Sequence, residues 1–170
     1  GIFSVLRKIF EALNSFNSVL SQAFISESIL THHSGKKKIN PVIIKLFWVS
    51  LVSTLILSTT VFYFSPIIIY LVSGSFDTDL INGLRLMIFS LVIIGLNVPC
   101  VHFLISKRKE KYISLSVLSG AIVDFICLLI FVPIFKFKGA IYSVLVTELL
   151  TTIFLYLISI KILNNERKTN

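Results

Sequence analysis

The sequence predicts an all-α protein, a polytopic transmembrane helix bundle of about five spans, and three features indicate this fold class. Of its 170 residues, 55% are apolar and only 14% are charged, whereas a soluble domain carries about 25% charged residues. The mean hydropathy is +0.93. Two long stretches, 46–76 and 86–106, contain no Asp, Glu, Lys or Arg, and about 20 apolar residues suffice for a helix to cross a bilayer. The composition excludes both a water-soluble globule and a disordered chain.

The expected spans follow one another with short connections. They cover residues 3–30, 42–63, 84–106, 112–133 and 139–161. A short interfacial helix over 66–72 is expected after the second span, because proline is favourable in a first helical turn and Pro66 stands there. Pro99 is expected to kink the third span.

Most basic residues fall in segments that lie on one side of a five-span chain. These are the connection after the first span, the connection between the third and fourth spans, and the C-terminal tail. Because an excess of Lys and Arg in short loops marks the cytoplasmic side, the C-terminus is predicted to be cytoplasmic. The net charge of +8 is therefore interpreted as topology, and no nucleic-acid partner is expected.

Polar side chains recur on one face of the first span. Arg7, Glu11, Asn14 and Ser18 follow one another at helical steps, with Lys8 beside them. Because unpaired polar groups are costly in hydrocarbon, we expect this face to line a water-filled cavity. Two plainer interpretations stay open. The polar groups can bond to neighbouring helices, and Arg7 can form an i,i+4 ion pair with Glu11.

Asp124 and Glu148 are the acidic residues inside the last two spans. They stand equally far before and after Lys136, which centres the connection between these spans. An antiparallel hairpin therefore places both near the middle of the membrane. A carboxylate at that depth is a candidate proton or cation site, or a substrate contact. The alternative is that each is neutral or paired with a cation of a neighbouring helix, such as Arg85.

No sequence motif indicates catalysis or metal binding. The pair His32 and His33 has no Cys or carboxylate nearby at ligand spacing. The chain has no Gly-rich phosphate loop, nucleophile elbow or HExxH motif. We therefore expect no enzyme activity, no cofactor and no metal.

Several short motifs follow one another along the whole chain. They are Gly1-Ile2-Phe3-Ser4, Ser21-Gln22-Ala23, Ser65-Pro66-Ile67-Ile68, Gly120-Ala121-Ile122-Val123-Asp124 and Pro133-Ile134-Phe135. In this order and spacing, the chain resembles the C-terminal portion of bacterial polysaccharide exporters, in particular O-antigen flippases of the multidrug/oligosaccharidyl-lipid/polysaccharide exporter superfamily.

The resemblance implies the C-terminal part of a twelve-helix transporter in the bacterial inner membrane. Such a flippase moves undecaprenyl-pyrophosphate-linked oligosaccharide across the membrane by alternating access. Its implied partners are the N-terminal half of the same transporter, membrane lipid and the polysaccharide polymerase machinery.

The resemblance also implies roles for individual residues. Lys8 falls where the family commonly has Lys or Arg and is expected to hold the pyrophosphate, with Arg7 as a second candidate. Glu148 matches an acidic position of the family. Asp124 stands where Asn is more usual, so its coupling role is inferred from its depth alone. Two other functions stay open: a multidrug or cation-coupled antiporter of the same superfamily, and a membrane-bound polymerase or ligase of lipid-linked sugars.

Overall fold

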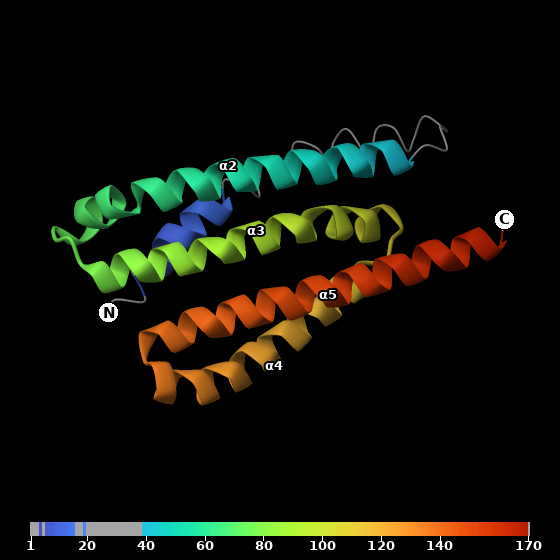
Figure 1. The fold of residues 1–170 in the computed structure, drawn as a ribbon. Coiled ribbons are helices and arrows are strands. Elements are labelled where there is room, and N and C mark those ends of the chain that lie inside the picture. The colour runs from blue at the N-terminus through green and yellow to red at the C-terminus, as the bar shows by residue number, and fades with distance from the viewer. Residues whose placement is uncertain (1–3, 5, 16–18, 20–38, 170) are drawn as a thin grey trace.

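The computed structural model describes residues 4, 6–15, 19 and 39–169, and its regular elements there are all helices (Figure 1). The long helices are α2 (Ile39–Ser73), α3 (Thr78–Ser106), α4 (Glu110–Phe135) and α5 (Phe137–Thr169). All four are long and apolar enough to cross a membrane. The chain is therefore an all-α, multi-pass membrane protein, as the sequence predicts.

The long helices lie side by side and alternate in direction (Figure 1). Helix α3 packs against α2 on one side and α5 on the other, and α4 packs against α5. The connections are short, namely 74–77, 107–109 and Lys136. We call the end of the bundle with the first and last of these the 74–77 end, and the opposite end the 107–109 end.

The first predicted span, 3–30, lies largely outside the described residues. Within them, residues 6–15 form a helical segment. This segment packs near the 74–77 end, because Leu6 is completely buried and would contact a Cβ added at Gly83 of α3. Predicted site residue Ser18 lies outside the described part of the chain.

Helix α2 continues through Pro66 to Ser73, so the predicted break between a span 42–63 and an interfacial helix 66–72 is wrong. Proline removes the hydrogen bond that its N–H would donate to the carbonyl oxygen four residues earlier, that of Phe62. The Ser65 hydroxyl donates to this oxygen instead, at 2.9 Å. The helix therefore continues with its free carbonyl satisfied.

Helix α3 begins earlier than the predicted span 84–106 because Asp77 caps it. The Asp77 carboxylate accepts hydrogen bonds from the backbone N–H groups of Asp79 and Leu80, at 2.9 and 3.3 Å, and a carboxylate at this position stabilises a helix start. The spans predicted over 112–133 and 139–161 lie inside α4 and α5.

Pro99 stands inside α3 without ending it. Its missing N–H leaves the carbonyl oxygen of Gly95 without the usual partner within the helix. The Ser50 hydroxyl of α2 donates to that oxygen at 2.9 Å. Pro99 therefore frees a carbonyl oxygen of α3 that accepts a hydrogen bond from α2, and this bond links the two helices.

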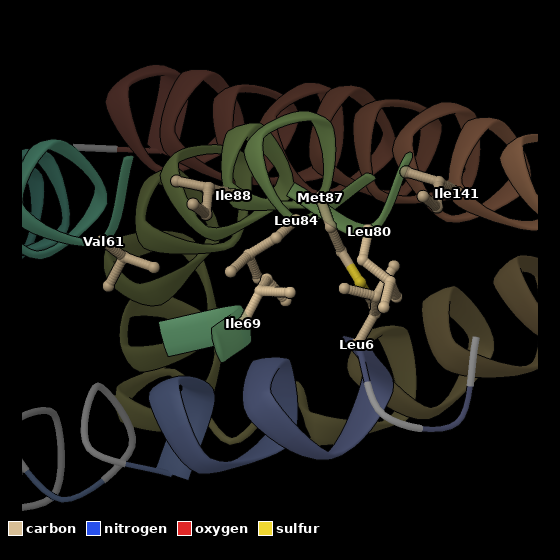
Figure 2. Close-up of a cluster of buried hydrophobic side chains, with 8 residues drawn as sticks. All are labelled: Leu6, Val61, Ile69, Leu80, Leu84, Met87, Ile88 and Ile141. Atoms are coloured by element: carbon tan, nitrogen blue, oxygen red, sulfur yellow. The ribbon is translucent and has the colours of Figure 1, made fainter. Parts of the chain in front are cut away.

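Two clusters of buried apolar side chains hold the bundle together, one toward each end. Figure 2 shows the cluster of the 74–77 end, which joins the helical segment 6–15 to α2, α3 and α5 through Leu6, Val61, Ile69, Leu80, Leu84, Met87, Ile88 and Ile141. The second cluster, at the 107–109 end, contains Cys100, Phe103, Leu104 and Leu155. Helix α4 joins the second cluster through its first turns, by Tyr112 and Ile113.

Candidate functional site

A partly open cavity of about 360 Å³, lined by apolar and polar side chains, lies among α3, α4 and α5. Asp124 of α4 and Glu148 of α5 both line it. The sequence predicts that these carboxylates share a depth, and it leaves open whether they face each other. The structure brings both into the wall of one cavity, beside the second apolar cluster.

Small side chains bring α4 and α5 close together beside the two carboxylates. Gly120 lies one turn before Asp124, and a Cβ added to it would be 2.7 Å from the Thr151 methyl carbon of α5. A larger side chain at this position would force the Thr151 side chain, or the two helices, to shift. The glycine therefore allows both acidic side chains to reach the same cavity.

Asp124 is held against α5 by Ser143, which is completely buried. The Ser143 hydroxyl lies within hydrogen-bond distance of the Asp124 Oδ1 atom and, at 3.0 Å, of the Asp124 backbone oxygen. Ser143 stands five residues before Glu148 on the same helix. One hydroxyl thus fixes the carboxylate of α4 relative to the helix that carries the second carboxylate.

Two further polar side chains line the cavity with unused hydrogen-bonding capacity. Asn97 Oδ1 of α3 and Thr147 Oγ1 of α5 are buried and have no hydrogen-bond partner among the described residues. Leaving such an atom unsatisfied costs about 1–3 kcal/mol. Both atoms are buried behind the cavity wall, so a proton donor in the cavity reaches them only if neighbouring side chains move. Sequence reasoning missed both residues, although Asn97 is conspicuous as the single Asn or Gln within the charge-free stretch 86–106.

Neither carboxylate forms an ion pair with a cation in the described part of the chain. Arg85, a partner that the sequence left open, donates from Nε to Ser65 Oγ of α2 at 3.0 Å instead. Two carboxylates in one cavity repel each other when both are charged. The arrangement is therefore suited to take up a proton or a small cation.

The helical segment 6–15 is apolar on one side and charged on the other. Ile9, Phe10 and Leu13 pack on the cluster of the 74–77 end. Arg7 and Glu11 point away from it, with side chains 65% and 59% exposed, and form an ion pair of 2.8 Å. The i,i+4 ion pair that the sequence leaves open as an alternative is thus present, whereas the cavity that this face is expected to line stays a prediction.

The other two predicted site residues of this segment also differ in exposure. Lys8 is exposed and Asn14 is half-buried. The charged face and the carboxylate cavity are separate sites, because segment 6–15 packs at the 74–77 end and does not line the cavity.

Within the residues that the structure describes, no three His, Cys, Asp or Glu side chains are grouped so that they could hold a metal ion. The described residues offer two carboxylates in one cavity and, apart from them, the charged face of segment 6–15. Comparison with protein-family models, with curated proteins and with solved structures gives no match for this chain.

Proposed function

We propose that the chain is part of a transporter that exports undecaprenyl-pyrophosphate-linked O-antigen units across the bacterial inner membrane by alternating access. The observation that carries this proposal is the two-sided segment 6–15. Leu6 is 0% exposed, whereas Arg7 and Lys8, the next two residues, lie exposed beside Glu11. A buried apolar side therefore holds a charged face in a fixed position within a membrane protein.

A charged face of this kind needs water or a polar ligand, because exposed charge is costly in hydrocarbon. A sugar head group that carries a pyrophosphate has the complementary need, since it cannot cross hydrocarbon unshielded. In this proposal, Lys8 holds the pyrophosphate. Arg7 is the weaker candidate because Glu11 already neutralises its charge at 2.8 Å. The N-terminal half of the same transporter would enclose the charged face of segment 6–15 in a water-filled cavity. The C-terminus would be cytoplasmic.

The two carboxylates would couple transport to a proton or cation gradient. Their shared cavity and the absence of a paired cation among the described residues support this role. Occupation of the cavity changes the charge between α4 and α5. A ligand that binds one conformation more tightly than another shifts the population between them, so the cavity can bias inward- and outward-open states.

Complementation of cells that lack their own exporter tests the proposal. The full-length transporter should restore O-antigen at the cell surface. Lys8→Ala should reduce the restored amount about tenfold, the effect of losing one hydrogen bond to a charged group. Lys109→Ala is the matched control, because Lys109 lies exposed at the 107–109 end and its side chain makes no cap hydrogen bond. Equal effects of the two substitutions would contradict the role of Lys8.

The carboxylate cavity also favours a second candidate, a cation-coupled antiporter for drugs of the same superfamily. Such a protein needs the acidic cavity but not a pyrophosphate-binding lysine. Cells that gain drug resistance but no surface O-antigen from the full-length protein would support this second candidate over the first.

A further inference from the structure

Arg85 places a charge inside the membrane-spanning part of the bundle. Helix α3 has 29 residues, from Thr78 to Ser106, and Arg85 lies about 10 Å from its middle at about 1.5 Å per residue. With α3 centred in the membrane, hydrocarbon extends about 15 Å from the middle toward each surface. Arg85 is therefore within the apolar layer, where an ionisable side chain points to a function.

The contacts of Arg85 hold its guanidinium at this depth. Its Nε donates to Ser65 Oγ of α2 at 3.0 Å, and its central carbon lies 4.9 Å from the centre of the Phe62 ring, also on α2. Ser65 is completely buried. Both contacts are with a hydroxyl or a ring face, and no carboxylate among the described residues pairs with Arg85.

The local chemistry of α2 fixes which atoms of Arg85 remain available. The Ser65 hydroxyl donates its proton to the carbonyl oxygen of Phe62, at 2.9 Å, which Pro66 leaves free. Its oxygen therefore only accepts toward Arg85. Of the five guanidinium N–H groups, the one on Nε is used, and the two terminal nitrogens form no hydrogen bond with a described residue.

A guanidinium held in this way is prepared for an oxyanion with two adjacent oxygens. Its planar fork matches phosphate and pyrophosphate, which accept two parallel hydrogen bonds. Arg85 lies about 5 Å inside the edge of the hydrocarbon layer, so the nearest anions are the phosphates of lipid head groups at that edge. Lipid phosphate is thus the ligand class that fits both the geometry and the depth.

We propose that Arg85, positioned by Ser65 and Phe62, binds the phosphate group of a membrane lipid at the contact between α2 and α3. Two lipids share this chemistry, a prenyl pyrophosphate and a phospholipid. The prenyl pyrophosphate arm rests on the proposed export function. In that arm, Lys8 lies at a depth similar to that of Arg85. The reason is that Leu6, two residues before Lys8, contacts Gly83, which is two residues before Arg85.

Lipid binding to the purified full-length transporter in neutral detergent tests the inference. Native mass spectrometry would measure binding of undecaprenyl pyrophosphate and phosphatidylglycerol, with undecaprenol and diacylglycerol as uncharged controls. The wild-type protein should retain at least one phosphate lipid in preference to its control. Arg85→Gln should weaken that binding about tenfold or more. Lys138→Gln, at the same end, should leave it unchanged because Lys138 already pairs with Asp79 at 3.1 Å.

Two further variants keep the test decisive if Arg85→Gln fails to fold. Arg85→Lys retains the charge but loses the fork, so binding should fall to an intermediate value. Phe62→Leu retains Arg85 and removes the ring beneath it, so binding should fall about threefold. The inference would be overturned if the folded Arg85 variants bound every phosphate lipid as tightly as the wild-type protein does. It would also be overturned if the wild-type protein retained the uncharged lipids as well as the phosphate lipids.

The same experiment separates this inference from the export function. Binding of phosphatidylglycerol that depends on Arg85 supports the inference even where undecaprenyl pyrophosphate does not bind. Failed complementation together with Arg85-dependent binding would contradict the export function alone.

Discussion

The contact between α2 and α3 is tight at Gly95, and Gly95→Ala tests it. A Cβ at this position would lie 2.5 Å from Oγ1 and 2.6 Å from Cγ2 of Thr54. Thr54 is 1% exposed, and its hydroxyl donates to the Ser50 carbonyl oxygen at 2.8 Å. Because Thr54 is almost completely buried and its hydroxyl is bonded within its own helix, we expect the added methyl group to move α2 and α3 apart.

The expected loss of stability follows from three terms. Overpacking a well-packed contact costs about 1–3 kcal/mol. Separation of the helices also lengthens the hydrogen bond from Ser50 Oγ to the Gly95 oxygen, now 2.9 Å, and such a bond contributes about 1 kcal/mol. Alanine is a better helix former than glycine by about 1 kcal/mol, which offsets the second term. The free energy of unfolding should therefore fall by about 1–3 kcal/mol.

Unfolding in mixed micelles with increasing SDS, followed by circular dichroism, measures this change. The double variant Gly95→Ala with Thr54→Ala should recover part of the loss, because it removes the two nearest atoms and keeps the Thr54 Cβ, at 3.0 Å. The single variant Thr54→Ala completes the cycle, and neighbouring residues should show a coupling energy. Unchanged or increased stability of Gly95→Ala would refute the packing of α2 on α3 described above.

Three further substitutions test the cavity and the bundle. Glu148→Gln should abolish the dependence of transport on pH or sodium, measured in vesicles, whereas Asp79→Asn, which lies outside the cavity, should preserve it. Ser50→Ala should lower the free energy of unfolding in the same SDS titration by about 1 kcal/mol, because the oxygen of Gly95 loses its partner. Gly120→Val should lower both stability and coupled transport, because its Cβ would lie 2.7 Å from a threonine methyl carbon of α5. Transport by Gly120→Val at the wild-type rate would contradict the close packing of α4 on α5.

The common depth of Asp124 and Glu148 could be predicted from the sequence because depth depends only on the rise per residue and the position of the turn. Their presence in one cavity could not, because facing depends on the rotation of each helix. That rotation is set by packing such as the contact between Gly120 and Thr151. Asn97 and Thr147 were missed for the same reason, since a neutral polar residue reveals its role only through what surrounds it.

The course of α2 shows where a local rule fails. Proline favours a first helical turn, and this preference predicts a new helix at Pro66. The outcome depends instead on one hydroxyl, that of Ser65, which satisfies the carbonyl oxygen that proline leaves free. A similar exchange occurs at Pro99, where the hydroxyl comes from another helix. The preference of proline for a position in a helix takes no account of such contacts with other residues.

The charged face of segment 6–15 was predictable because it follows helical period, and the same period identifies its buried side. Cysteine labelling in the full-length protein tests the central claim that this face meets water. Cys100 and Cys127 would first be changed to Ala, and single cysteines placed at Glu11, at Ser15 and at Phe10. The exposed positions Glu11 and Ser15 should react with a membrane-impermeant maleimide at least about ten times faster than Phe10, which packs on the apolar cluster. Equal, slow reaction at all three positions would show that the face is sealed from water, and the export mechanism would then have no place for its anionic head group.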